Sequence, residues 1–272
     1  MEYHIISGSV IETRRCFMPV REGGTKKRGT RVAGNTSMRK IVLNEMEAVK
    51  RLARLLNCNF SEGLIFATLK YSNERLPGNY EAAQAEAAEF LRKVRRDAKR
   101  SGGAPLRYIA VTANWSPKRK AAARLHHHIV LPADTSLDLI SRYWPKGEIH
   151  IRRAGAQKDL TPLAAYLIDN VHGQAAGKKT WSSSKGLDKP RYTEPVPVDD
   201  VENIVPLPET SIISADPVYN EEGRVVGAYM RAYAYVKPVV RGSMVILPRK
   251  KRGGRKDGFD AQAVAGIMDE DE

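Results

Sequence analysis

The chain has 272 residues, and 42% of them are hydrophobic, which is enough to form one large buried core or two smaller ones. Its formal net charge of +14 indicates a polyanionic partner, although a basic protein without such a partner has the same excess of lysine and arginine. No apolar run reaches the roughly 18 residues of a transmembrane helix, and Cys16 and Cys58 alone exclude a disulfide framework or a metal finger. We therefore expect a cytoplasmic protein without a signal peptide or a membrane partner.

The first 58 residues are expected to form an N-terminal extension. Weak alternation of apolar residues predicts an edge strand over residues 1–15. Residues 21–31 are rich in glycine and basic side chains, which suits either a phosphate-binding loop or a solvated linker. Apolar residues at helical spacing then predict a helix over residues 39–57.

The central region, residues 59–190, alternates between strand and helix patterns. The expected order is strand, helix, strand, strand, helix, strand and helix, over residues 63–71, 80–99, 108–112, 124–131, 137–143, 147–152 and 161–171. Only a basic loop at 116–124 separates the second and third strands, so they are expected to form a hairpin. This order predicts an α+β fold, an antiparallel sheet with helices packed on it in a split or ferredoxin-like arrangement.

The composition changes after residue 190. Scattered prolines among acidic and β-branched residues predict an accessory segment, β-rich or irregular, over residues 191–248. Residues 249–272 combine a basic patch with an acidic tip, which is typical of a disordered tail whose basic part contacts nucleic acid.

Three consecutive histidines mark the third strand of the central region. Because side chains alternate faces along a strand, His126 and His128 share one face and His127 lies on the other, apolar face. Two imidazoles two residues apart on one face can hold a single metal ion; the alternative is a histidine cluster without metal. His127 is expected to be part of the core.

A third ligand for such an ion has several candidates. Asn114 ends the preceding strand with an oxygen donor, and Glu148 and His150 share a face of the following strand. Two imidazoles with one such ligand and open positions suit Mg²⁺ or Mn²⁺ polarising a phosphate, and zinc is compatible too.

Tyr166 lies in the middle of the last predicted helix. Its hydroxyl, with a pKa of roughly 10, is a weak nucleophile near neutral pH. Attack on a metal-polarised phosphodiester would nevertheless leave a phosphotyrosine link that conserves the bond energy. The alternative is a tyrosine that packs its ring on the sheet and leaves its hydroxyl in water.

Five sequence marks occur in a fixed order. They are Phe66-Ala-Thr-Leu-Lys-Tyr71, Arg124-Leu-His-His-His-Ile129, Trp144-Pro-Lys-Gly147, Tyr166 on its helix, and Trp181-Ser-Ser-Ser-Lys185. Together they resemble the rolling-circle replication initiators of the HUH endonuclease superfamily, in particular those of bacterial phages and mobile plasmids. The resemblance covers roughly residues 59–190.

The resemblance implies a function for these residues. His126 and His128 would hold a divalent metal, and Tyr166 would nick single-stranded origin DNA to give a 5′-phosphotyrosine and a free 3′-hydroxyl. In the cytoplasm of a bacterial host cell, a host polymerase would extend that hydroxyl. A host helicase would unwind the DNA, since the chain has no phosphate-binding loop of the Gly-x-x-x-x-Gly-Lys type.

The chain departs from the family pattern at two positions. Asp169 stands where the family has a lysine one helical turn after its tyrosine, and Asn114 stands beside the place of a glutamate ligand. Lys178 or Lys179 are candidates to replace that lysine. These departures favour the alternative of a catalytically weakened or inactive nucleic-acid-binding module on the same fold. A further alternative, which shares the nicking chemistry, is an HUH relaxase or transposase.

Basic residues are expected to bind the DNA backbone. Those selected are Arg92, Lys93, Arg95, Arg96, Lys118, Arg119, Lys120, Arg124, Lys178 and Lys179.

Overall fold

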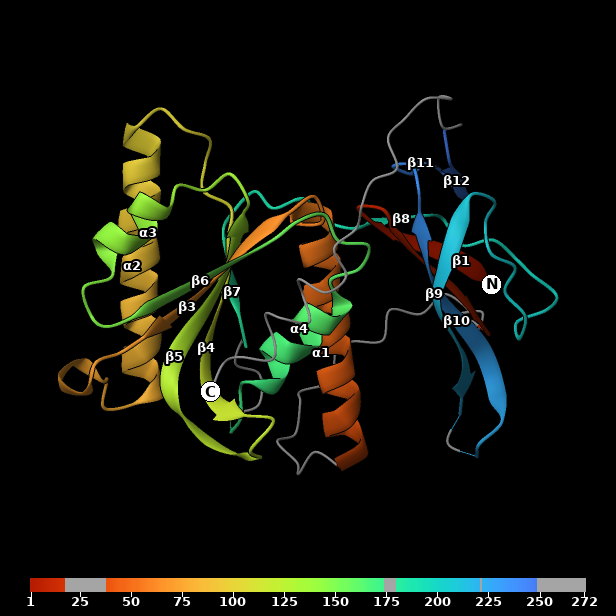
Figure 1. Ribbon diagram of the computed structural model, residues 1–272. Coiled ribbons are helices and arrows are strands. Elements are labelled where there is room, and N and C mark those ends of the chain that lie inside the picture. The colour runs from red at the N-terminus through yellow and green to blue at the C-terminus, as the bar shows by residue number, and fades with distance from the viewer. Residues whose placement is uncertain (18–37, 174–179, 221, 249–272) are drawn as a thin grey trace, which may run out of the picture. The chain divides into compact units, whose positions relative to one another are not determined.

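The computed structural model describes residues 1–17, 38–173, 180–220 and 222–248. Within these ranges the chain forms two compact units, each built on an antiparallel sheet, and the fold is α+β as predicted (Figure 1). No helix in the described ranges is long and apolar enough to cross a membrane. The basic loop expected at 21–31 and the tail expected at 249–272 lie outside the described residues.

The first unit combines both ends of the chain. Its five strands are β1 (Glu2–Ser7), β2 (Val10–Cys16), β8 (Arg191–Tyr192), β9 (Thr210–Tyr219) and β10 (Val225–Ala234), in the order β8-β1-β2-β10-β9. A small hairpin of β11 (Val239–Arg241) and β12 (Met244–Ile246) accompanies this sheet. Ile6, Ile11 and Ala234 are buried together in its core.

The boundaries of this unit differ from the expected ones. Residues 1–58 and 191–248 were predicted to be separate regions, but Thr13 of β2 pairs with Met230 of β10 in one sheet. The predicted helix is α1 (Met38–Asn59), and the division between the units falls inside it, between Ala48 and Val49. Apolar alternation shows that a segment is a strand but not which distant strand pairs with it.

The second unit contains every strand and helix predicted between residues 63 and 171. Its sheet has the order β6-β3-β5-β4-β7, with all neighbours antiparallel. These strands are β3 (Leu64–Lys70), β4 (Ile109–Ser116), β5 (Ala121–Pro132), β6 (Ile149–Ala154) and β7 (Ser182–Ser183). The helices are α2 (Tyr80–Arg100), α3 (Leu137–Tyr143) and α4 (Thr161–Asp169), and a short 3-10 turn (Asn73–Arg75) follows β3.

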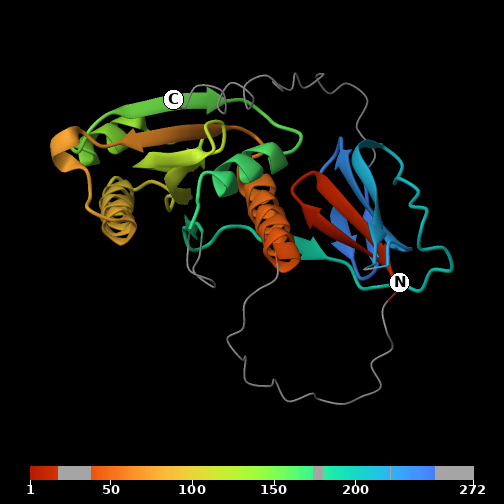
Figure 2. The same cartoon turned by 90° about the horizontal axis from the view of Figure 1, so that it is seen from below.

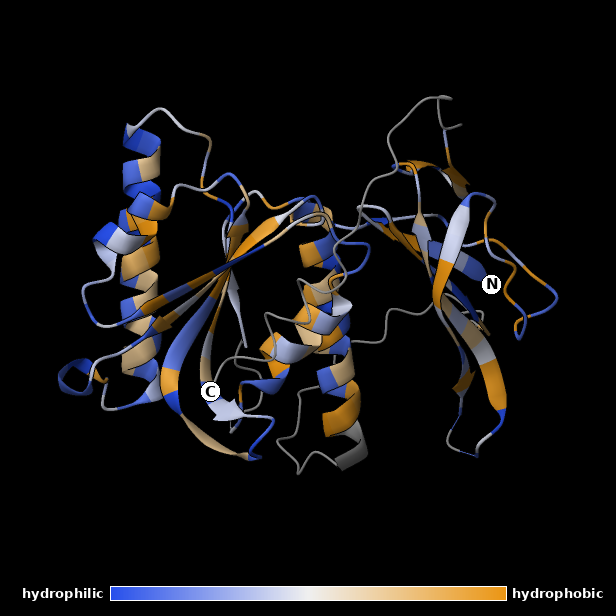
Figure 3. Ribbon diagram, viewed as in Figure 1, coloured by the Kyte–Doolittle hydropathy of each residue, from blue (hydrophilic) through white to orange (hydrophobic). Residues whose placement is uncertain are grey.

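Helices α2 and α3 cover one face of this sheet. The side chain of Asn79 caps α2 by accepting the backbone N–H of Ala82 at 2.8 Å, and Gly102, at φ 71°, follows its end. Figure 3 shows the apolar stripe of α2, and its Phe90 and Leu91 pack against Ile129 and other apolar residues of the sheet. This is the face on which His127 was expected.

Helix α4 and the end of α1 belong to the other face. Tyr166 of α4 contacts the rings of Phe66 and His128, which lie on the opposite side of β3 and β5 from Ile129. Figures 1 and 2 both show α4 beside the C-terminal half of α1, and Asn57 of α1 accepts the N–H of Leu160 at 2.8 Å. This packing places Tyr166 over the face that carries His126 and His128.

Candidate metal and nucleic-acid site

His126 and His128 lie side by side on one face of β5. Their Nε2 atoms are 3.1 Å apart, and their ring centroids are 4.7 Å apart. The Nδ1 of His126 lies 2.7 Å from the carbonyl oxygen of Arg124, which can only accept a hydrogen bond. In the neutral ring of His126 the proton is therefore on Nδ1, and Nε2 is the electron-pair donor.

This geometry fits a single divalent ion. Two ligands about 2.1 Å from an ion and at right angles lie about 3.0 Å apart, close to the separation of the two nitrogens. His128 is fully buried, and its Nδ1 lies 3.3 Å from the hydroxyl of Thr68. Burial, reinforced by the charges of His126, His127 and Lys70, holds the pKa of His128 well below its usual value. The ring is thus neutral at physiological pH, as metal binding requires.

Of the expected third ligands, Asn114 and His150 are engaged elsewhere, and Glu148 lines the same pocket as His126. Asn114 donates from Nδ2 to the carbonyl oxygen of His172 and accepts its N–H at Oδ1, both at 2.9 Å. His150 is two strands from His128, with Thr68 between them, a separation of roughly 10 Å at about 4.8 Å per strand. Its Nε2 lies 3.1 Å from Glu148. Among the residues that the structure describes, no cluster of three His, Cys, Asp or Glu could complete a metal site.

Tyr166 is half-buried beside the histidine pair. Its ring centroid lies 5.5 Å from that of His128 and 6.2 Å from that of Phe66, which itself stacks on His128 at 5.1 Å. The helix that carries Tyr166 begins where Asp159 accepts the N–H of Thr161 at 3.0 Å, with a proline in its first turn. Asp169, one turn after Tyr166, is exposed.

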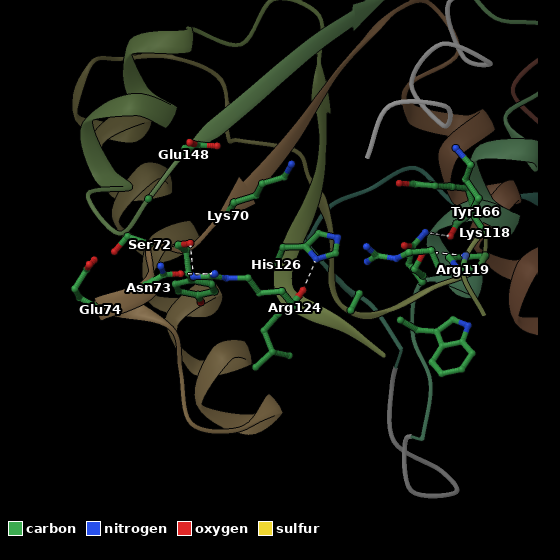
Figure 4. A pocket seen from close by; sticks show the side chains of 18 residues that line it. Lys70, Ser72, Asn73, Glu74, Lys118, Arg119, Arg124, His126, Glu148 and Tyr166 are labelled. Carbon is green, nitrogen blue, oxygen red and sulfur yellow. Dashed lines mark hydrogen bonds between the residues drawn. The ribbon is translucent and has the colours of Figure 1, made fainter. Parts of the chain in front are cut away.

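A pocket of about 750 Å³ joins His126 to Tyr166. Figure 4 shows labelled residues of β3, β5, the β4–β5 hairpin and α4 around it. Four of the lining residues are cations: Lys70, Lys118, Arg119 and Arg124. Glu74 and Glu148 are its carboxylates, so positive charge predominates at the lining. A cationic pocket next to a histidine pair can bind a phosphate group.

The predicted DNA-binding residues divide into separate groups. Lys120, at φ 49°, lies in the same hairpin turn as Lys118 and Arg119. Arg124 donates to Asn73 Oδ1 at 2.6 Å and to the carbonyl oxygen of Tyr71 at 2.9 Å.

Four other predicted cations lie away from the pocket. Arg92, Lys93, Arg95 and Arg96 are exposed on α2, which covers the opposite face of the sheet from His126. Lys178 and Lys179 lie outside the described residues.

Lys70 is a site residue that the sequence prediction missed. It lies directly opposite His126 in the β3–β5 register and therefore on the same face of the sheet. Its charge contributes to the lowered pKa of His128, so its ammonium group acts on the histidine pair. The sequence pattern that could have identified Lys70 is the alternation of faces along β3. Lys70 is two residues after Thr68, which pairs with His128, so both side chains lie on the face of the histidine pair.

His127 has the opposite environment, as predicted. It is fully buried, with Nε2 2.7 Å from the hydroxyl of Tyr71 and Nδ1 3.1 Å from that of Thr112. Burial, with a smaller contribution from the charge of His126, lowers the pKa of His127 to about 3. His127 is therefore a neutral side chain in the core, within hydrogen-bond distance of Tyr71 and Thr112.

Comparisons with known proteins give no match that assigns a function to this site. No protein-family model matches the chain, and no curated protein and no solved structure matches it at a significant level. The residues that point to a function are therefore the histidine pair, the tyrosine and the cations around the pocket.

Proposed function

We propose that the second unit is a ferredoxin-like, HUH-type nicking domain and that the protein initiates rolling-circle DNA replication of a bacterial phage or plasmid. The observation that carries the proposal is the approach of Tyr166 to a histidine pair at a cationic pocket. The element order strand, helix, strand, strand, helix, strand, with the sheet order β6-β3-β5-β4, supports the fold assignment.

The substrate in this proposal is single-stranded origin DNA. The oxygen of Tyr166 forms a bond to the scissile phosphorus, and its proton passes to water. The bond from phosphorus to the 3′ oxygen breaks, and that oxygen takes a proton and leaves as a 3′-hydroxyl for a host polymerase. A divalent ion held by His126 and His128, Mg²⁺ or Mn²⁺, would withdraw charge from the phosphate.

Lys70 supplies the phosphate-binding cation in this proposal. The resemblance led us to expect that cation one helical turn after Tyr166, where Asp169 stands. Lys70 reaches the same face from β3, opposite His126, and it lines the pocket together with Tyr166. Lys118 and Arg119 of the hairpin hold neighbouring phosphates of the strand.

A covalent-capture experiment tests the proposal without a known nick site. The protein is incubated with Mn²⁺ and a random single-stranded DNA pool labelled at its 3′ end, and then denatured in detergent. We expect label to remain on the protein, because the fragment 3′ of the nick carries the phosphotyrosine. Sequencing the captured strands gives the preferred site. Absence of the adduct, or an adduct that persists in Tyr166→Phe or in chelator, overturns the proposal.

A second function is favoured by one observation: among the described residues no third His, Cys, Asp or Glu forms a metal-binding group with the histidine pair. We infer from it, together with Asp169, the alternative of a nucleic-acid-binding module that does not cleave. This alternative predicts single-strand binding that a chelator leaves unchanged and no covalent adduct. A relaxase or transposase would form the adduct, and its preferred strand would be a transfer origin or a transposon end.

A further inference from the structure

Trp115 and His172 form an aromatic stack next to the site. Their ring centroids are 4.3 Å apart, with an angle of 22° between the ring planes. Trp115 is half-buried and lines the same pocket as His126 and Tyr166. The indole therefore stacks on the ring of His172 and also borders the pocket.

A β-bulge builds this stack. The β4–β5 register shifts between Ala113 and Trp115, and the N–H groups of Asn114 and Trp115 both donate to the carbonyl oxygen of Asn170, at 3.1 and 3.2 Å. The two hydrogen bonds between Asn114 and the backbone of His172 fix the chain just after α4. Bulges redirect side chains beside functional sites. Here the backbone hydrogen bonds of the bulge hold Trp115 at the end of α4, the helix that carries Tyr166.

We infer that Trp115, backed by His172, is the stacking platform for one base of the single strand bound at Tyr166. Its ligand class is a nucleobase of single-stranded DNA, since aromatic side chains beside a basic groove bind such strands by stacking. The cations of the hairpin, Lys118 and Arg119, are three and four residues after Trp115 and line the same pocket, where they would bind the flanking phosphates. This inference rests on the proposed function, because it places the base in the strand that Tyr166 attacks.

Equilibrium binding to two matched probes tests the platform. The probes are an oligothymidine and an abasic strand of the same length and charge, measured by fluorescence anisotropy at one salt concentration. Chelator is present and the Tyr166→Phe background is used, so that no strand is cut. Stacking on one aromatic side chain contributes about 5- to 150-fold to affinity. We expect Trp115→Leu to lose affinity for oligothymidine within this range and to leave the abasic strand unchanged.

Two further variants separate stacking from folding. Trp115→Phe keeps an aromatic face and should restore most of the affinity for oligothymidine. Tyr219→Leu removes an exposed aromatic side chain of the first unit and should change neither probe. Equal losses for the two probes, or no loss in Trp115→Leu, overturn the inference. A failure of covalent capture would overturn the nicking proposal and leave this non-covalent measurement to decide on the platform.

Discussion

Trp144 donates its indole N–H to the carbonyl oxygen of Lys70 at 3.0 Å, which joins the segment after α3 to the end of β3. Ser72 donates its N–H to the carbonyl oxygen of Lys146 at 2.8 Å, in the same junction. Gly147 lies so close to this backbone that a Cβ atom would collide with the oxygen of Lys70. The Trp-x-x-Gly pattern therefore positions the strand end that carries Lys70.

Gly147→Ala is expected to destabilise the second unit by about 1–3 kcal/mol or more, because the backbone must move to admit the methyl group. Urea unfolding followed by tryptophan fluorescence measures this, since all three tryptophans lie in that unit. Gly78→Ala is the matched control: a Cβ there meets no atom within 4 Å, so a change within about 0.5 kcal/mol is expected. Equal stability of the two variants would contradict the close approach at Gly147.

Mn²⁺ binding should depend on the histidine pair alone among the candidate imidazoles. His126→Gln and His128→Gln are each expected to weaken Mn²⁺ binding by at least about tenfold, because each removes one donor nitrogen. His150→Gln should leave the affinity unchanged, since His150 is two strands away from His128. Titration followed by electron paramagnetic resonance measures the free ion. A loss in His150→Gln equal to that in His128→Gln would restore His150 as a ligand.

Asn114→Ala should change stability and not metal affinity. The substitution removes both side-chain hydrogen bonds to the backbone of His172, at a cost of about 1–3 kcal/mol. Asn114→Asp keeps the acceptor for the N–H of His172 but places a carboxylate oxygen against its carbonyl oxygen, so it should also destabilise. Urea unfolding and the Mn²⁺ titration, run on the same preparations, separate the two roles. Weakened Mn²⁺ binding without a loss of stability would instead make Asn114 a metal ligand.

Lys70→Ala is expected to slow formation of the covalent adduct by about 10²- to 10³-fold, because it removes a charge that stabilises the transition state. Lys70→Arg should retain part of the rate. Asp169→Lys, added to Lys70→Ala, should recover activity by placing a cation one turn after Tyr166. Single-turnover capture with the selected oligonucleotide gives the rates, and the Mn²⁺ titration checks that the metal site is intact. An unchanged rate in Lys70→Ala would exclude this role.

The burial of His127 predicts a pH-dependent stability. Its pKa is about 3 in the folded chain against an ordinary value of 6.5, so the unfolded chain binds the extra proton between these values. The free energy of unfolding should therefore fall as the pH drops through this window, by up to about 1.4 kcal/mol per pH unit from this residue. Urea unfolding across the window should show a shallower slope in His127→Gln. The same slope in both proteins would contradict a neutral buried His127.

Alternation within single strands and the hairpin of β4 and β5 could be predicted from the sequence, but the pairing of strands distant in the sequence could not. Strand parity alone separated His126 and His128 from His127, and the structure agrees with that division. His150 had the correct parity for a ligand, but β3 lies between its strand and that of the histidine pair. Asn114 lies in a bulge, which regular alternation does not anticipate. Distances across a sheet depend on strand order, which is decided by packing throughout the unit.

The pairing of β2 with β10 has a consequence for folding during synthesis. Met230 follows Thr13 by 217 residues, so the ribosome needs about 10–40 s to supply the partner of β2. All strands of the second unit lie between Leu64 and Ser183, so they are all synthesised before β10. During this interval β2 has an unpaired edge, which invites pairing with other chains. A chaperone that covers the N-terminal hairpin would therefore act on the nascent protein, before β10 is synthesised.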